Sequence, residues 1–598
     1  MSRTASDAPD DDAHGSFLHC ISPTAPGAQF DASGSARDGR GSADRKDLVE
    51  IDRQLARRPI EVVLTGGNLT ITEVLAVARD GAEVSFTEDP AVLGRIDACY
   101  QRMMRDVRDG VPVYGCNTGY GAQATQTHTA GTAHQRLATA RAISESIAAI
   151  DVGVGPVFGT DVVRAAMLIR VNMLKQGVSG VKRADLELYR QLLNRGITPV
   201  VNQYGGLGAS GDLAHNGRVV SVLRQLEGTE VWDRSGRVRP AGEVLAEAGL
   251  PPLVLDPKAG LGLCNGDNFS TALAILLAVD TMEALLAAAV LGAMTIEALC
   301  GTDRSFHPQL DALRPHDGQR EVARLYRRLL EGSRLAFQEM KGHGPREVDV
   351  SVQDGYSLRG ISQYHAVNFE KVRAALDTLT VNANSVSDNP LWVIPDHATP
   401  GEAPWEWVSG ANFLAMHVAE VLDGLRKTMT QIVKLNDRHL ARLVTPHQNN
   451  GLPANLSGPD ANVRCVFKGV QIQAGMLEVY SALLSIPVTT FFGVHEEGNQ
   501  DISAHSLTSG ILGLENLRLV RYSIAQNLLA LAQAVDLRGG PELLAPRTRP
   551  VYEFVRDRAG FAASERPLHH EIETLYQAIV AGQFADVLRS ETFAGIES

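Results

Sequence analysis

Aromatic residues are scarce in this sequence, where Phe, Trp and Tyr together make up 5% of 598 residues. Large sheets rely on aromatic and β-branched side chains, so this scarcity argues against a mainly β protein. Alanine and leucine dominate instead, and both are strong helix formers. The composition therefore predicts a mainly α-helical chain.

Cysteine is also scarce, and none of the six cysteines has the C-x-x-C spacing of a zinc or redox site. We interpret them as free thiols, which are typical of a reducing cytoplasm. The sequence has no H-E-x-x-H motif and its histidines are dispersed, so we expect no metal site. The glycine spacing matches neither a phosphate loop nor a dinucleotide fold, so we expect no nucleotide either.

Two further absences narrow the class of partner. No signal-like segment opens the chain, and the most apolar stretch, 271–299, is interrupted by Asp280 and Glu283. We therefore predict a buried bundle helix there rather than a membrane span. The formal net charge is -13, which argues against nucleic acid or an anionic membrane as the main partner. These absences do not exclude a small molecule as the partner.

The chain is too long for one core of ordinary size, and its composition changes along its length. Residues 1–45, which are rich in Asp, Ser, Gly and Ala, predict a disordered extension. Residues 46–265 mix short apolar stretches with helical ones and predict an N-terminal domain. Residues 266–540 predict a central helical bundle, and residues 541–598 predict a small C-terminal helical cap.

Five Ala- and Leu-rich segments of the predicted bundle carry apolar residues at helical spacing. Several of them are apolar on most faces, so they need neighbours all round. We therefore expect a large bundle core that is shared between subunits. The five predicted helices are 267–299, 369–382, 412–443, 469–485 and 510–535.

The most informative segment is the glycine-rich run 205–213, which contains Ala209-Ser210-Gly211. If the chain bends hard there, the amide nitrogen of Gly211 can attack the carbonyl carbon of Ala209, and loss of water closes a five-membered ring. Loss of a second water turns the Ser210 side chain into an exocyclic methylidene. Gly211 has no Cβ to block the attack, and a helix predicted over 212–226 would favour negative charge on the ring. The same run is also compatible with an ordinary turn before a helix.

Together with several separated motifs, this segment resembles the family of histidine, phenylalanine and tyrosine ammonia-lyases and the related 2,3-aminomutases. The resemblance implies a mainly α fold, with a long helical bundle and a mixed N-terminal domain that carries the ring-forming loop. It also implies a homotetramer in which three chains build each active site. The cofactor that it implies is a 4-methylidene-imidazol-5-one formed from Ala209-Ser210-Gly211, without metal or nucleotide. The other motifs are 114–121, 263–266, 353–359, 384–390, 410–413 and 467–501.

The resemblance implies roles in catalysis for single residues. Tyr114, in a motif similar to the family's inner lid loop, would take the β-proton, for which we expect a lowered pKa. Arg359 would clamp the substrate carboxylate in a bidentate pair, with Tyr356 beside the ring and the amine. Glu496 would contact the amine or take up its proton.

Five further residues would bind the substrate or the ring by the same resemblance. Asn265 would hydrogen-bond the ring or the carboxylate, or else cap the helix that follows it. Asn412 would join the carboxylate network, and Phe413 would pack near the ring or in the core. Lys468 would lie near the carboxylate and Gln500 near the ring, unless these polar side chains belong to a buried structural network.

Two positions depart from the family's pattern. A proline-containing stretch usually follows the ring motif, and 212–217 contains no proline, which changes the first turn of the helix behind the ring. Arg141 and Ala142 align with the pair that selects the substrate side chain, and an arginine fits none of the known types. A buried arginine needs an anionic partner. Either the substrate side chain is oxygenated or acidic, or Arg141 pairs with Glu145 on the next helical turn, or the alignment is shifted by one residue.

The activity that the resemblance implies is that of an ammonia-lyase, which converts an aromatic or related L-amino acid into an α,β-unsaturated acid and ammonia. Return of the amine to the β carbon would make the protein a 2,3-aminomutase instead. The choice depends on how long the lid stays shut. A third alternative is an inactive helical scaffold, against which the joint presence of Ser210, Tyr114 and Arg359 argues.

Overall fold

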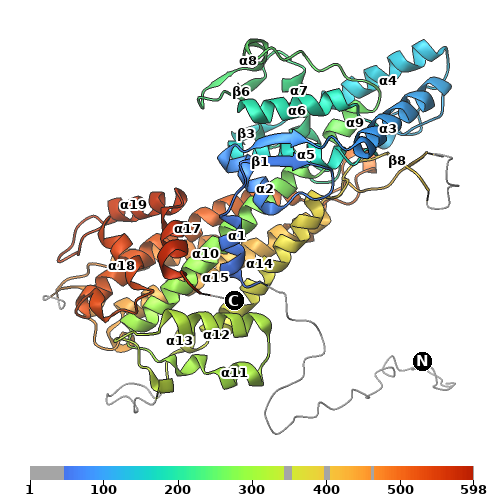
Figure 1. Cartoon of the computed structure of the whole chain (residues 1–598). Helices are drawn as coiled ribbons and strands as arrows, with labels where there is room; N and C mark the ends of the chain where they lie inside the picture. Colours follow the sequence, from blue (N-terminus) through green and yellow to red (C-terminus); the bar gives the residue numbers. More distant parts are fainter. Residues whose placement is uncertain (1–45, 342–352, 396–404, 459–462, 597–598) are drawn as a thin grey trace, which may run out of the picture. The chain divides into compact units, whose positions relative to one another are not determined.

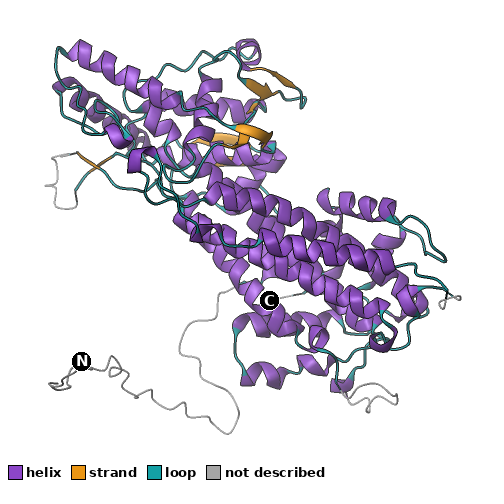
Figure 2. Ribbon diagram, turned by 180° about the vertical axis from the view of Figure 1, so that it is seen from behind, coloured by secondary structure: helices purple, strands orange, loops and turns teal. Residues whose placement is uncertain are grey.

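Five long helices pack against one another and form the core of the molecule (Figures 1 and 2). The computed structural model describes residues 46–341, 353–395, 405–458 and 463–596, and the chain from Asp47 on forms one compact unit. The predicted extension, 1–45, lies outside the described residues. The five helices are α10 (Asn268–Ala298), α14 (Ile361–Ala383), α15 (Met416–Val444), α16 (Lys468–Leu484) and α17 (Ser506–Leu537).

The central helix α10 is apolar all round, and almost all of its 31 residues are buried. It is long and apolar enough to cross a membrane, but 89% of its most apolar window is buried inside the protein. Arginines pair with the two acidic residues in its middle: Asp280 accepts from Arg79 at 2.8 Å and from Arg521 at 3.0 Å, and Glu283 pairs with Arg589. The prediction of a buried bundle helix is therefore confirmed.

The long helices have two ends, which carry different parts of the candidate site. Where α10 and α17 begin, Ser270 and Ser506 are hydrogen-bonded at 2.8 Å, and this end is called the near end. Where they finish, the Arg538 side chain donates to the carbonyl of Ala298 at 2.8 Å, and this end is called the far end. A helix of 31 residues is about 45 Å long, so the two ends are widely separated within one chain.

Short helices and small sheets surround the near end (Figure 1). Strands β1 and β2 are parallel, whereas β3 with β5, β4 with β6 and β7, and β8 with β9 are antiparallel. No sheet among the described residues exceeds three strands, so the predicted mainly α fold is confirmed. The helices are α2 (Ile71–Leu75), α3 (Pro90–Asp109), α4 (Ala133–Ala148), α5 (Thr160–Leu174), α6 (Arg183–Arg195), α7 (Leu213–Leu223), α8 (Ala241–Glu247) and α9 (Ala259–Cys264), whereas α1 (Leu48–Leu55) lies beside the middle of α10. The strands are β1 (Glu61–Leu64), β2 (Glu83–Phe86), β3 (Val154–Val157), β4 (Thr198–Pro199), β5 (Asn202–Tyr204), β6 (Glu230–Trp232), β7 (Val238–Pro240), β8 (Leu391–Val393) and β9 (Glu406–Val408).

Two further groups of short helices pack on the long ones. Figure 1 shows α11 (Pro308–Leu313), α12 (Asp317–Leu329) and α13 (Tyr356–Arg359) at the far end. The predicted C-terminal cap is helical and consists of α18 (Arg549–Arg556), α19 (His569–Val580) and α20 (Gln583–Val587). The cysteines of the described residues are free thiols, as predicted, and Cys20 lies outside the described residues.

Candidate active site

The Ala209-Ser210-Gly211 segment lies at the near end and is held on one side by the chain that leads into α10. Gly211 forms a parallel bridge with Gly266, and the backbone N–H of Asp212 donates to the Gly266 carbonyl at 2.8 Å. Gly211 has a φ of 62°, and a Cβ there would lie 2.4 Å from the carbonyl carbon of Gly266. Only glycine fits this position without a shift of the backbone.

The chain that leads into α17 holds the other side of the same segment. The N–H of His505 donates to the carbonyl of Leu207 at 2.7 Å. The side-chain amide of Gln500 donates to the Ser210 hydroxyl at 3.1 Å. A tight turn is thus clamped between two segments, with Gln500 on the oxygen that ring formation would expel.

A buried carboxyl group, which the sequence analysis left without a role, directly follows this segment. Asp212 accepts from the backbone N–H of Ser270 at 2.7 Å and from its hydroxyl at 2.6 Å. Burial raises the pKa of Asp212 to about 7, so the group can exchange a proton near neutral pH. Its position directly after Gly211 was the signal that could have identified it.

Helix α7 begins at Leu213 without the expected proline. In place of a proline-containing turn, the His215 ring packs against Phe158 and Phe269, with ring centroids 5.7 and 5.6 Å away. Burial lowers the pKa of His215 to about 4, so its ring is neutral at pH 7. The Asn216 amide donates to Asn268 at 2.9 Å and so ties α7 to α10. Together these contacts replace the family's first turn.

The lid motif places Tyr114 beside Glu496. The Tyr114 hydroxyl accepts from the backbone N–H of Gly121 at 2.9 Å. A Cβ on Gly121, whose φ is 59°, would lie 1.5 Å from a Glu496 carboxylate oxygen, so this carboxylate packs directly on the glycine. The amide of Asn499 donates to the other oxygen of Glu496 at 2.8 Å.

The pKa that we expected for Tyr114 is wrong in direction. Burial and then the negative charge of Glu496 raise the pKa of Tyr114 above its usual value, and these effects outweigh the hydrogen bond from Gly121. In the described residues, no cation is among the groups that act on this pKa. The hydroxyl of Tyr114 is therefore protonated at neutral pH in this chain.

Asn265 and the 410–413 motif meet through Asn389. The Asn265 amide donates to the Asn389 carbonyl at 3.3 Å, and the N–H of Gly410 donates to the Asn389 side chain at 2.8 Å. Asn265 does not cap α10, because Asp267 occupies the N-cap position. Asn412 is exposed and donates weakly to the Val386 carbonyl at 3.4 Å.

Phe413, next in the chain, is half-buried. Because α15 begins only at Met416, Phe413 lies in the loop before that helix rather than in its first turn. The motif that contains Asn412 and Phe413 is thus linked to Asn265, and through Asn265 to the near end.

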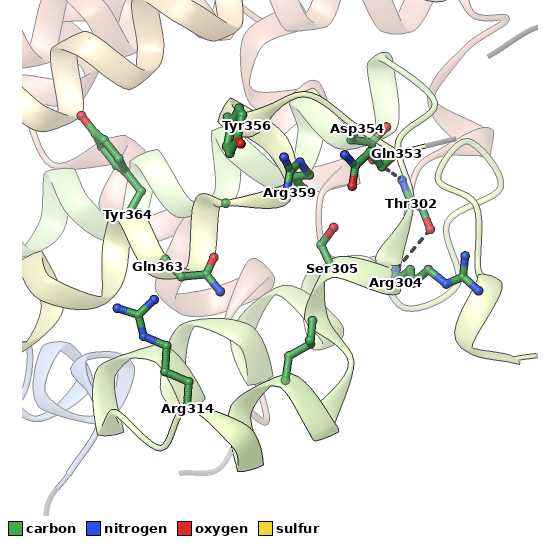
Figure 3. Close-up of a pocket in the computed structure, with 12 residues that line it drawn as sticks. Thr302, Arg304, Ser305, Arg314, Gln353, Asp354, Tyr356, Arg359, Gln363 and Tyr364 are labelled. Carbon is green, nitrogen blue, oxygen red and sulfur yellow. Dashed lines mark hydrogen bonds between the residues drawn. The ribbon is translucent and has the colours of Figure 1, made fainter. Parts of the chain in front are cut away.

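Tyr356 and Arg359 lie instead at the far end, on α13. They line a cavity of about 730 Å³ (Figure 3). The Arg359 guanidinium lies 4.0 Å from the centre of the Tyr356 ring, and among the described residues no carboxylate is within ion-pair distance of it. An arginine without a carboxylate partner in the described part of the chain is available for an anionic ligand.

Lys468 begins α16 and is exposed. Its neighbour Phe467 donates its backbone N–H to the carbonyl of Asn455. The residue after Asn455 is Leu456, whose carbonyl accepts from the Gln533 side chain, in the last turns of α17, at 3.1 Å. Lys468 therefore lies at the far end. Within one chain, Tyr356, Arg359 and Lys468 are separated by about the length of α10 from the Ala209-Ser210-Gly211 segment.

Arg141 has a carboxylate partner, and it is Asp256 rather than Glu145. It donates to Asp256 from two nitrogens, at 3.0 and 3.3 Å, and Glu145 takes no part. Tyr100 and Lys182 also donate to Asp256, at 2.9 and 3.0 Å. The Arg141 side chain is 49% exposed and therefore not fully buried. Asp256 of the same chain supplies its anionic partner.

The comparisons with known proteins agree on one family. The family model for aromatic amino acid lyases matches residues 69–557. A histidine ammonia-lyase from Symbiobacterium thermophilum is 35% identical, over 90% of this chain and 99% of its own length. A tyrosine ammonia-lyase from Cupriavidus metallidurans is 32% identical, over 89% of this chain and 98% of its own. The crystal structure of a tyrosine aminomutase from Streptomyces globisporus superposes with a TM-score of 0.80 at 30% identity, covering 90% of this chain and 99% of that one.

Proposed function

Because the chain belongs to the aromatic amino acid lyase family, we propose that it removes the α-amino group of an aromatic L-amino acid or histidine and releases an α,β-unsaturated acid and ammonia. Its relatives are named ammonia-lyases, and the chain is accordingly a carbon–nitrogen lyase. The observation that carries the more specific proposal is the clamped segment, in which Gly211 tolerates no side chain and Gln500 holds the Ser210 hydroxyl.

The residues of this segment fit a 4-methylidene-imidazol-5-one. A positive φ at Gly211 bends the backbone, and Asp212, the next residue in the chain, offers a carboxyl group with a pKa of about 7. When formed, the group supplies an electrophilic carbon for the substrate amine and so makes a poor leaving group a better one. Ala209, Ser210 and Gly211 would constitute it, and Gln500 and Asn265 would border it.

The remaining residues would bind the substrate and move its protons. Arg359 would hold the carboxylate with its two parallel N–H groups, while Tyr356 keeps the guanidinium in place. Tyr114 would take the β-proton once it is ionised. Glu496 would receive the substrate ammonium, and that cation would offset the negative charge that raises the pKa of Tyr114.

These roles require more than one chain. Arg359 and Ser210 are separated by about the length of α10, some 45 Å, and no amino acid bridges that span. We infer a homo-oligomer in which the far end of one chain meets the near end of another, in keeping with the homotetramer that the family resemblance implies.

Helix α16 offers a surface for this assembly. Only 22% of its most apolar window is buried, although the window is hydrophobic enough for a core. Its exposed apolar side chains recur at intervals of three and four residues, which places them on one face of the helix. Such a face on a water-exposed protein favours association with another copy of the chain. They are Ile472 (66% exposed), Met476 (58%), Val479 (60%) and Leu483 (61%).

An aminomutase is the second candidate function, and the structural similarity to a tyrosine aminomutase favours it. Both reactions use the same residues up to the release of the amine. They differ in whether the amine leaves the site or returns to the β carbon of the unsaturated acid.

The experiment that tests the proposal combines intact mass with product analysis. Purified protein should be lighter than its sequence predicts by two water molecules, and the Ser210→Ala variant should show no such loss. Incubation with histidine, phenylalanine and tyrosine should yield an unsaturated acid and ammonia from at least one of them, whereas an isomeric β-amino acid would indicate the mutase. A full-mass protein without turnover would contradict the proposal and favour an inactive scaffold.

A further inference from the structure

Two side chains of α15 hold the short helix that carries Tyr356 and Arg359. The Arg442 Nε donates to the Ser357 hydroxyl at 2.8 Å. The ring of His439, one helical turn earlier, is 2.9 Å from the Ser357 carbonyl oxygen. Ser357 lies between the two candidate substrate-binding residues in the sequence, so both bonds act on the piece of backbone that sets their directions.

The bond from His439 fixes its tautomer. A carbonyl oxygen only accepts, so the His439 Nε2 carries the proton. Its buried Nδ1 has no hydrogen-bond partner among the described residues, which suits a neutral ring, and burial lowers the pKa of His439 to about 4. The ring is thus a permanent neutral donor across the physiological pH range.

The bond from Arg442 depends on a glycine. Arg442 lies over Gly355, where a Cβ would be 1.9 Å from its Nη2. The guanidinium reaches the Ser357 hydroxyl only because that space is free. Among the described residues no carboxylate pairs with Arg442, so an acid partner does not account for its position.

Among the described residues, few other contacts hold Tyr356 and Arg359. The Tyr356 side chain is 79% exposed, and its ring lies against the Arg359 guanidinium. Leu358 is the one buried side chain of α13. The direction of Arg359 therefore depends mainly on how the backbone of α13 is held.

We infer that His439 and Arg442 are positioning residues, which aim Arg359 and Tyr356 at the substrate bound by another chain. The inference rests on the proposed function, because it takes Arg359 as the group that binds the substrate carboxylate. It goes beyond that function by assigning a role to two α15 residues that contact neither substrate nor ring.

The test uses the full-length oligomer and four variants, His439→Leu, His439→Gln, Arg442→Met and Ser357→Ala. His439→Leu and Arg442→Met should each lower kcat/KM by about 10- to 100-fold, because a small misplacement of a binding group has effects of this size. KM should carry the larger share, since Arg359 binds the substrate before the reaction. His439→Gln, which keeps an N–H donor, should recover much of the loss.

A double-mutant cycle separates positioning from general damage. If Arg442 acts through the Ser357 hydroxyl, the Ser357→Ala, Arg442→Met double variant should lose no more activity than the worse single variant. The two-water mass loss should be unchanged in all variants, because the ring segment lies at the opposite end of the chain. Arg438→Met, a control on the same helix whose arginine pairs with Asp437, should remain as active as the parent.

The outcomes are distinguishable. Suppose that the parent protein is active and shows the mass loss, and that Arg442→Met and His439→Leu have the same kcat/KM as the parent. This result would overturn the present inference but not the proposed function. Multiplicative losses in the double variant would also overturn it, because Arg442 would then act elsewhere. A parent protein with neither mass loss nor turnover would overturn the proposed function, and this inference with it.

Discussion

At the scale of single residues, the pairing of Tyr114 with Glu496 predicts the pH dependence of the reaction. The pKa of Tyr114 is raised by burial and by the Glu496 charge, and a tyrosine accepts a proton only when ionised. kcat/KM should therefore rise with pH until Tyr114 is deprotonated. Glu496→Gln removes the negative charge, so the rise should move to lower pH, even where the variant's overall activity falls.

The pH profiles of kcat/KM for the parent and Glu496→Gln proteins would check this expectation. Tyr114→Phe serves as the control, because it should lose about 10²- to 10⁴-fold in activity, as expected for a general base. Its residual activity should lack the rise with pH. A shift to higher pH in Glu496→Gln would mean that another group governs the profile.

Arg141 gives a second prediction at this scale. Because Asp256 already neutralises it and its side chain is 49% exposed, the acidic-substrate hypothesis loses its physical basis in this chain. Arg141→Ala should leave the ranking of substrates unchanged and lower the free energy of unfolding by less than about 1 kcal/mol, as for other exposed ion pairs. A substrate panel and a denaturant titration would measure both. A selective loss of acidic or hydroxylated substrates would instead support a place for Arg141 in the pocket.

These residues also show what the sequence can and cannot predict. Motif residues that contact neighbours within their own motif, such as Tyr114 with Gly121, were found without a structure. The partner of Arg141 was not, because Asp256 is far away in the sequence and comes close only through the packing of α9 against α4. The raised pKa of Tyr114 was missed because its main cause, burial, and the nearby charge of Glu496 both arise from packing between distant segments.

At the scale of elements, all five long helices were predicted, and only their boundaries differ. Helix α17 begins at Ser506 rather than at residue 510, because His505 adopts a left-handed conformation with φ 54° and starts the helix directly after it. Helix α14 begins at Ile361 rather than at residue 369, since polar residues of its first turns hide the apolar period. Helical spacing thus predicts the existence of an element better than its ends.

The junction between α10 and the C-terminal cap predicts how stability varies with pH. Glu297 is buried on α10 and accepts from the Thr548 hydroxyl and the Ala545 N–H, each at 2.7 Å. Burial raises the pKa of Glu297 to about 7 from 4.5. Between these two values the folded state keeps a proton that the unfolded state has lost, so stability falls as pH rises through this window.

Glu297→Gln should flatten this part of the stability profile, because a neutral amide has no proton to lose. Melting temperatures measured from pH 4.5 to 7.5 would show a smaller decline in the variant than in the parent. Asp212, with a pKa also near 7, should maintain some of the slope. Glu420→Gln, at an exposed position on α15, is the matched control and should leave the slope as it is. An unchanged slope in Glu297→Gln would mean that Glu297 is ionised in the folded protein.

At the scale of the whole molecule, the family resemblance implied that several chains share each site, but the sequence could not reveal which candidate residues lie together within one chain to form two groups. Each motif is recognisable by itself, but the separation of Ser210 from Arg359 follows only from the course of α10. Whether the two groups belong to one site in the assembly is therefore a question about several chains, and it can be answered by mixing them.

Ser210→Ala and Arg359→Ala should each be inactive alone and should recover activity when they are refolded or expressed together. If Ser210 and Arg359 of one site come from different chains, random mixing in equal amounts leaves about one quarter of the sites with both residues intact. Activity should then approach about a quarter of the parent value. Ser210→Ala mixed with Tyr114→Phe should stay inactive, because Ser210 and Tyr114 both belong to the near end, joined there by the segment that carries Glu496 and Gln500. If both mixtures stay inactive, Ser210 and Arg359 of one site do not come from different chains. Because the length of α10 prevents one chain from supplying both residues to a site, the proposed role of Arg359 would then be wrong.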